Sequence, residues 1–267
     1  MKDLLGDTHC EPVQPAAAWL GGKRKLSKTI CKRIAALKHT TYVEPFVGLG
    51  GVFLRRPFLA QCEIINDING ELVNLFRILQ RHYPQFMDCL KFQIASRRDF
   101  DRLLKTDPAT LTDLERAGRF LYLQRLAFGG KAVFQSFGVS TGTTGRFNVT
   151  KLEPLLADIH ERLCGVTVEN LPWHDVIEKY DSPETLFYLD PPYFGGETDY
   201  GQHVFSRSDF GKIAKKLGAI EGRFLLSIND TPEIRACFGH FHLQELEIIY
   251  DIAKDKGTPA KELIVSN

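Results

Sequence analysis

The segment TYVEPFVGLGG, residues 41–51, runs from β-branched and aromatic residues directly into a group of glycines. Its first half predicts a short strand over about 41–46, and its glycines predict a bend at which backbone can approach a ligand closely. The segment CEIINDING (62–70) follows the same plan, because a second predicted strand ends at Asp67 before an amphipathic helix begins. Strands that alternate with helices in this way are typical of an α/β fold.

The same alternation returns in the second half of the chain. We expect helices at 151–163, 173–180, 208–218 and 231–237, and strands at 166–169, 185–189, 223–228, near 242–248 and near 262–266. This pattern predicts a doubly wound, Rossmann-like sheet. Between the two halves, residues 84–128 look helical, and ten of the 18 residues in 129–146 are Gly, Ser or Thr, which is typical of a loop. The predicted organisation is therefore a sheet domain with a helical insertion, with the boundaries 16–80 plus 150–267 for the sheet domain and 81–149 for the insertion.

The N-terminal region has two parts. The first 15 residues predict a loose arm, and a glycine turn then leads into a helix with apolar residues at helical spacing. Residues 23–38 carry seven Lys or Arg and no acid, although the net charge of the whole chain is only +1. This basic segment is either a phosphate-binding face or an ordinary solvated helix face.

The six cysteines lie at least 21 positions apart, so no CxxC pair or zinc-ligand spacing is present and no metal site is expected. Reduced, mostly buried thiols and a cytoplasmic location are the expectation. No stretch approaches 18 continuous apolar residues, which argues against a membrane span.

The segment LFYLDPPYFGGE (186–197) predicts a strand that ends at an acid and two prolines. Prolines donate no hydrogen bond, and the residue before a proline is extended. Asp190 therefore projects from the strand tip beside the Pro191 carbonyl, with Tyr193 as a flat neighbour. Such an accepting site suits a planar group that donates two N–H bonds, and the exocyclic amine of a nucleobase fits this description.

The glycine bend predicts the second ligand. The dinucleotide fingerprint GxGxxG fails because Phe53 stands where its last glycine belongs, which disfavours NAD or FAD. Asp67 is placed to accept bonds from ribose hydroxyls, or alternatively to cap the helix after it. A ribose without a cradled pyrophosphate indicates an adenosine-containing cofactor such as S-adenosylmethionine.

Together these motifs resemble the Dam-type family of N6-adenine-specific DNA methyltransferases. The similarity covers most of residues 19 to 230, in the order of the α arrangement of amino-methyltransferases. It rests on WLGGK (19–23), YVEPFVGLGGVFL (42–54), IINDINGELVNLF (64–76), FLYLQRLAFGGK…GRFN (120–148) and FYLDPPYF (187–194).

The resemblance implies a role for each matching residue. In the cofactor site, Trp19 and Lys23 contact S-adenosylmethionine, Lys23 near its methionine end, Asp67 holds the ribose, and the pocket is shaped by Phe46, Gly48 and Gly50. The catalytic tip is Asp190, Pro191, Pro192 and Tyr193: the carboxylate and the Pro191 carbonyl bind the amine of a flipped adenine, Tyr193 stacks on the base, and Asp190 also touches the cofactor.

The insertion and the basic helix are the expected contacts to double-stranded DNA. The recognition segment contains Gln124 and Arg125, where the family often has Asn-Arg. Lys131 and Arg146 are placed to meet phosphates, and Gln135 to read a base edge. Phe134 and Phe137 are either wedges that fill the space of the flipped base or core residues. Because the loop departs from the family hairpin, no target sequence is predicted.

Rival functions remain open at this point. They are methylation of cytosine N4, of RNA adenine or of a protein glutamine, a non-catalytic DNA-binding protein, and, least favoured, an NAD enzyme. A monomer without an obligate protein partner is expected. Restriction–modification, phage defence and regulation are all possible host processes.

Overall fold

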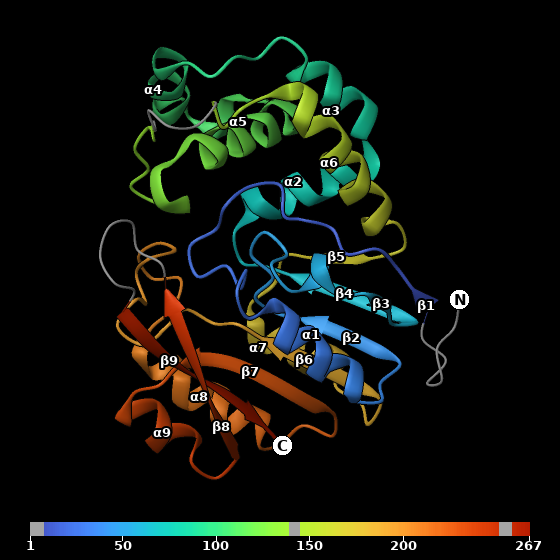
Figure 1. Cartoon of the computed structure of the whole chain (residues 1–267), viewed down its shortest axis with the longest axis vertical. Helices are drawn as coiled ribbons and strands as arrows, with labels where there is room; N and C mark the ends of the chain where they lie inside the picture. Colours follow the sequence, from blue (N-terminus) through green and yellow to red (C-terminus); the bar gives the residue numbers. More distant parts are fainter. Residues whose placement is uncertain (1–7, 139–144, 251–257) are drawn as a thin grey trace.

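The computed structural model describes residues 8–138, 145–250 and 258–267. A seven-stranded sheet forms its centre, with the strand order β5-β4-β2-β6-β7-β9-β8 (Figure 1). The strands are β2 (Thr41–Glu44), β4 (Cys62–Asn66), β5 (Thr167–Glu169), β6 (Thr185–Leu189), β7 (Arg223–Asn229), β8 (His242–Tyr250) and β9 (Thr258–Ser266). Five strands are parallel to one another, namely β2, β4, β5, β6 and β7. Strand β9 runs antiparallel to both β7 and β8. The predicted Rossmann-like sheet is confirmed.

Helices cover both faces of this sheet, and side-chain alternation along β6 shows why. Leu186 and Tyr188 belong to the core cluster on one face, while Phe187 and Leu189 belong to the cluster on the other. A strand buried on both sides is apolar throughout rather than alternating with polar residues. The first cluster includes residues of α1 (Ser27–Ala36), α2 (Gly70–Arg81) and α6 (Val149–Leu163), and the second includes residues of α7 (Trp173–Tyr180), α8 (Arg207–Leu217) and α9 (Pro232–Phe238).

The inserted helices are α3 (Tyr83–Leu90), α4 (Arg97–Lys105) and α5 (Asp113–Leu126), which lie with α2 and α6 above the sheet in Figure 1. Thr112 and Glu115 form a capping box at the start of α5. Phe86 of α3 and Leu121 of α5 belong to the same core cluster as Leu75 of α2. The insertion therefore shares its core with helices that cover the sheet, and its boundaries at 81 and 149 remain a prediction.

Two expectations about the sequence were wrong. Residues 8–15 are not a loose arm: β1 (Thr8–His9) pairs antiparallel with β3 (Phe58–Leu59), and Val13 is buried, its N–H donating to the Leu54 carbonyl at 2.8 Å. The first seven residues of that predicted arm lie outside the described part of the chain. A two-residue strand has too little periodicity to be predicted.

The thiols also differ from expectation. Only Cys31 is buried, Cys10 and Cys237 are half-buried, and the other three are exposed, namely Cys62, Cys89 and Cys164. These exposed cysteines lie at the ends or outer faces of elements, where a small side chain need not face the core. Among the helices of residues 8–138, 145–250 and 258–267, none has the length and apolar character needed to cross a membrane.

Candidate active site

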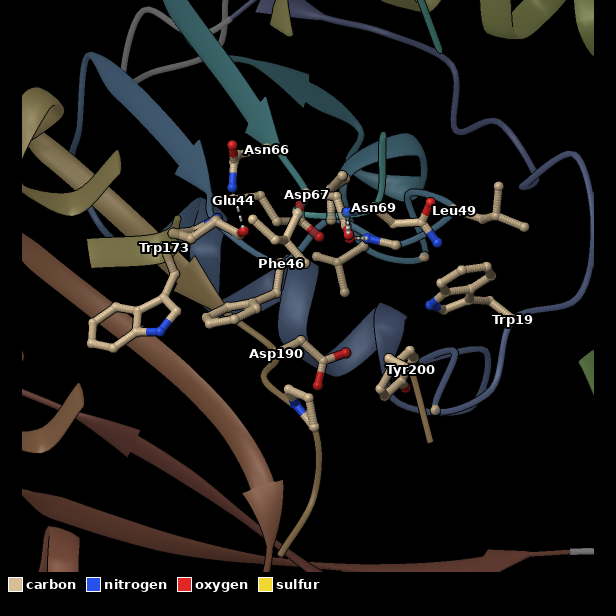
Figure 2. Close-up of a pocket in the computed structure, with 18 of the residues that line it drawn as sticks. Trp19, Glu44, Phe46, Leu49, Asn66, Asp67, Asn69, Trp173, Asp190 and Tyr200 are labelled. Atoms are coloured by element: carbon tan, nitrogen blue, oxygen red, sulfur yellow. Dashed lines mark hydrogen bonds between the residues drawn. The ribbon is translucent and has the colours of Figure 1, made fainter. Parts of the chain in front are cut away.

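A cavity of about 1640 Å³ opens at the carboxyl ends of the parallel strands. Its walls come from segments far apart in sequence: the turn before α1, the bends after β2 and β4, the start of α7, and the loop after β6 (Figure 2). Open α/β sheets bind their ligands at this edge. Of the predicted site residues, the cavity is lined by Trp19, Lys23, Phe46, Gly48, Asp67, Arg125, Asp190 and Pro192.

Gly48 is required at its position for two reasons. Its φ of +50° is unfavourable for other residues, and a Cβ there would lie 2.7 Å from Nε1 of Trp19. The Trp19 ring therefore packs directly on the bend, and its other neighbours are the rings of Tyr200 and Phe120, with centroids 6.0 and 6.3 Å away. This contact joins the N-terminal segment to the glycine bend.

Gly50, in contrast, faces the core. Its φ is +77°, and a Cβ would lie 2.8 Å from Cγ of Leu54. It is absent from the cavity lining, whereas the neighbouring Gly51 is part of it. The expectation that Gly50 shapes the pocket therefore holds only through the turn that it allows.

Asp67 links the two bends. Its Oδ2 accepts the Gly48 N–H and its Oδ1 accepts the Asn69 N–H, each at 2.9 Å. Burial raises the pKa of this carboxyl group, and those backbone hydrogen bonds oppose the rise. The helix-cap alternative is wrong, because Asn69 is the N-cap of α2 and its side chain accepts the N–H groups of Glu71 and Leu72. Each carboxylate oxygen has a second acceptor direction, so Asp67 can still receive ligand hydroxyls.

Asp190 follows β6 at the predicted place, but it has a cationic partner. Lys23 Nζ lies 2.7 Å from Asp190 Oδ1, and the two side chains are 3% and 20% exposed. The same ammonium donates to the Tyr193 hydroxyl at 2.7 Å and to the Gly21 carbonyl at 3.2 Å. The expectation of a purely accepting tip is therefore corrected: the carboxylate is charge-paired on one oxygen. Pro191 and Tyr193 are outside the cavity lining, although Tyr193 is held beside it by this bond.

Burial raises the pKa of Asp190 to about 6, against the opposing effect of the Lys23 charge. The group is therefore mostly ionised at neutral pH. Ser227 on β7 donates to Asp190 Oδ1 at 3.2 Å, and the Tyr188 and Ser227 hydroxyls lie 2.8 Å apart. Both Lys23 and Ser227 contact Oδ1, so the described residues leave Oδ2 available to a ligand.

Glu44 lies in the cavity wall at the end of β2. It is 2% exposed, and its Oε2 accepts the Tyr42 hydroxyl at 2.8 Å. Burial raises its pKa to about 8, so the group is mostly neutral at pH 7. Glu44 therefore has the chemistry of a neutral, buried carboxyl group.

The predicted DNA-contacting residues divide into two groups. Gln124 is 1% exposed: it donates to the Ala18 and Gly130 carbonyls and accepts from Gln135. Arg125 donates to the Ala16 and Arg146 carbonyls. In this conformation the Gln124 amide makes all of these hydrogen bonds inside the protein, and they connect the loop after α5 to the N-terminal segment. It presents no surface to DNA.

Lys131 and Arg146 are exposed, as a phosphate contact requires, and Arg146 also donates to the Ala127 carbonyl. The two candidate wedges differ. Phe134 is 85% exposed with a φ of +51°, whereas Phe137 packs edge-to-face on Phe100 at 5.4 Å. Part of the predicted contact loop, 139–144, lies outside the described residues.

Sequence reasoning missed three residues at this site. Trp173 and Tyr200 line the cavity, and Ser227 donates a hydrogen bond to the Asp190 carboxylate. Trp173 and Tyr200 carry no sequence signal, because only folding brings them to the cavity. Ser227 carried one: it is a polar residue in the middle of the apolar strand segment FLLSIN. A buried polar side chain in such a strand needs a hydrogen-bonding partner.

Comparison with known proteins agrees with this geometry. The profile of the family described as D12 class N6 adenine-specific DNA methyltransferase matches residues 19–252. The chain is 24% identical to the type II methyltransferase M.CviBI of Paramecium bursaria Chlorella virus NC1A, over 94% of this chain and 96% of that one. It is 25% identical to the type II methyltransferase M1.LlaDCHI of Lactococcus lactis subsp. cremoris, over 96% and 95%. It is 26% identical to the DNA adenine methylase of Escherichia coli (strain K12), over 91% and 90%.

An α/β sheet with acids at the carboxyl ends of its strands is typical of enzymes that bind nucleotides at this edge. More specifically, the chain belongs to the D12 class of N6 adenine-specific DNA methyltransferases. It is an adenine-specific DNA methyltransferase, as the family resemblance in its sequence implied.

Proposed function

We propose that the cavity binds S-adenosylmethionine beside an adenine flipped out of double-stranded DNA, and that Asp190 binds the reacting amine. The observation that carries this proposal is that Asp67 and Asp190 line one cavity from the ends of β4 and β6, the two strands that flank β2. The family assignment gives the reaction, and what we add is the methyl donor and the role of each residue.

The residues around the glycine bend suit an adenosine-containing sulfonium. Asp67 is a half-buried acceptor for ribose hydroxyls, and Gly48 allows backbone to approach the ligand. Trp19 and Phe46 provide aromatic surface in the same wall. When bound, S-adenosylmethionine supplies an electrophilic methyl group on a positively charged sulfur.

Asp190 prepares the adenine nitrogen for attack. Its Oδ2 and the Pro191 carbonyl accept hydrogen bonds from the two N–H groups of the amine. These hydrogen bonds favour a pyramidal nitrogen with a localised lone pair. The N–C bond then forms as the S–C bond breaks, and that electron pair stays on sulfur. The surplus proton leaves the nitrogen through Asp190 to water. Positioning and electrostatics provide most of the rate.

Lys23 keeps Asp190 ionised and orients Tyr193 through the same ammonium group. A tyrosine whose hydroxyl is fixed can present its ring to the flipped base for stacking. The base must leave the duplex, because its amine is otherwise out of reach.

DNA approaches from the side of the insertion. Lys131 and Arg146 bind phosphates, and the exposed Phe134 enters the gap that the flipped base leaves. Gln124 and Arg125 shape the loop from inside rather than touch bases. Action as a monomer in the cytoplasm belongs to the same proposal.

The test is methyl transfer from S-[methyl-³H]adenosylmethionine to plasmid DNA, RNA and bulk protein, followed by digestion to nucleosides. We expect label only in DNA, as N6-methyladenine, and binding of S-adenosylmethionine by calorimetry that Asp67→Ala weakens. Asp88→Ala, at an exposed position on α3, is the control. Label in RNA, protein or N4-methylcytosine, or no cofactor binding at all, contradicts the proposal.

A further inference from the structure

We propose that Tyr188 and Ser227 act as a positioning pair that fixes the Asp190 carboxylate through Oδ1 and reserves Oδ2 for the substrate amine. This inference rests on the proposed function, because it assigns the carboxylate its orientation rather than its task. Neither residue belongs to the catalytic tip itself: Tyr188 precedes it within β6, and Ser227 lies on the neighbouring strand β7.

The register of the sheet brings the three residues together. Leu189 pairs with Leu226, so the next residues along the two parallel strands, Asp190 and Ser227, are neighbours. Side chains two positions apart in a strand point to the same face, which places Tyr188 on the face of Asp190. The Ser227 hydroxyl then lies 3.2 Å from Asp190 Oδ1 and 2.8 Å from the Tyr188 hydroxyl.

The chemistry of these groups gives the chain of hydrogen bonds a direction. An ionised carboxylate can only accept, so Ser227 spends its single O–H on Asp190. Tyr188 must therefore donate to Ser227. In the resulting chain, the Tyr188 hydroxyl donates to the Ser227 hydroxyl, which donates to Asp190 Oδ1, and each hydrogen bond polarises the next. Tyr188 and Ser227 are both 0% exposed, so water does not compete for these bonds.

This chain makes the two oxygens of Asp190 unequal. Oδ1 accepts hydrogen bonds from Ser227 at 3.2 Å and from Lys23 at 2.7 Å. With Oδ1 saturated, rotation of the carboxyl group would break two charge-assisted bonds. Oδ2 is thereby held toward the cavity that Asp190 lines.

Other charged and titratable groups also act on Asp190. The cation is Lys23, from the turn before α1, and Glu262 of β9 adds a negative charge that raises the pKa of Asp190. Glu44 of β2 also interacts electrostatically with Asp190. Tyr188 and Tyr200 are the nearby phenols that its charge affects. Ser227 and Tyr188 differ from all of these because their contribution is a directed hydrogen bond, which can be removed without changing the net charge.

The test compares pH profiles of kcat in wild type, Ser227→Ala, Tyr188→Phe and Ser227→Thr. Loss of the Ser227 donor disfavours the ionised carboxylate, so the acid limb moves up by about one pH unit, and kcat falls about twofold at pH 7 and roughly tenfold at pH 5. Tyr188→Phe moves the limb in the same direction by a smaller amount, and Ser227→Thr restores it. KM for S-adenosylmethionine stays within about twofold, because the pair does not touch the cofactor.

A direct readout needs no catalysis. Titration of ¹³C-labelled aspartate by NMR, with the Asp190 signal assigned through Asp190→Asn, should show the same upward pKa shift in Ser227→Ala and Tyr188→Phe. The matched control is Tyr122→Phe, which removes a buried tyrosine hydroxyl that donates to the Ile94 carbonyl at 2.8 Å. It should lower thermal stability without moving the Asp190 titration.

The outcomes distinguish failure of the proposed role of Asp190 from failure of the positioning pair. If wild type has no acid limb near pH 6, or Asp190→Asn is fully active, the role of Asp190 in the proposed function fails. If those results are as expected but both Ser227→Ala and Tyr188→Phe leave the titration unchanged, the positioning pair alone is overturned. Should Ser227→Ala not fold, Tyr188→Phe decides the question by the same titration.

Discussion

The Lys23 ammonium and the Asp190 carboxylate meet at 2.7 Å in a site where Lys23 is 3% and Asp190 20% exposed. Lys23 lies in the turn before α1 and Asp190 follows the end of β6, so the contact connects the N-terminal segment to the catalytic tip. Removal of one member of a buried pair leaves the other charge uncompensated, which is more costly than loss of a surface pair.

Lys23→Met should therefore impair catalysis in a pH-dependent way. Without the cation the pKa of Asp190 rises above 6, and at neutral pH a large share of the carboxyl groups becomes protonated. We expect kcat to fall roughly tenfold to a hundredfold at neutral pH and to recover in part near pH 8.5, measured by steady-state methyl transfer. Lys179→Met, which removes the cation of the surface pair with Glu169, is the matched control. Equal losses at both pH values would show that Lys23 acts in some other way.

Glu44 predicts a pH dependence of stability. Its pKa is raised from 4.5 to about 8 by burial, so the folded state keeps a proton that the unfolded state releases. Stability from this group is fully present below pH 4.5 and is lost as pH rises toward 8. Glu44→Gln mimics the neutral form, so its free energy of unfolding should be close to that of wild type near pH 5 and exceed it by about 4 kcal/mol near pH 8.5. Denaturant unfolding at the two pH values measures this, and parallel curves for the two proteins would refute it.

The Gly48–Trp19 contact predicts a strong steric effect. A Cβ at position 48 would lie 2.7 Å from Trp19 Nε1, and the positive φ adds strain. Gly48→Ala should weaken binding of S-adenosylmethionine roughly tenfold or more by calorimetry. Gly211→Ala in α8 is the matched control, because a Cβ there meets nothing within 4 Å. Unchanged affinity in Gly48→Ala would mean that the bend does not contact the cofactor.

The insertion predicts separable DNA effects for two exposed residues. Lys131→Ala should weaken DNA binding and lower the slope of log affinity against log salt by about 0.9. Phe134→Ala should keep that slope and instead slow base flipping, measured by the fluorescence of 2-aminopurine at the target position. A salt slope that Lys131→Ala leaves unchanged would remove Lys131 from the phosphate contacts.

Much of the fold and of the site could be predicted from the sequence, because those features depend on residues close together in the chain. Periodicity placed β6 at its observed bounds of Thr185–Leu189 and α7 at Trp173–Tyr180. Backbone chemistry placed Asp190 at a strand tip, because prolines restrict the residue before them. Sequence resemblance then selected N6-adenine methylation from several amino-methyltransferase reactions.

What could not be predicted depends on contacts between distant segments. No pattern pairs Lys23 with Asp190, or buries Gln124 under the Ala18 and Gly130 carbonyls. The N-cap of α2 could not be assigned from the sequence either, because Asp67 and Asn69 are both favourable capping residues. The structure shows that Asp67 instead accepts the Gly48 N–H of the glycine bend.

The most direct test of the central claim is single-turnover methyl transfer by Asp190→Asn at saturating S-adenosylmethionine and DNA. An asparagine keeps the size of the side chain but replaces one accepting oxygen with a donor and removes the charge that pairs with Lys23. The account predicts a rate about a thousandfold below wild type, with affinity for S-adenosylmethionine within about threefold. A rate within about tenfold of wild type would contradict the assignment of Asp190 as the residue that holds the reacting amine.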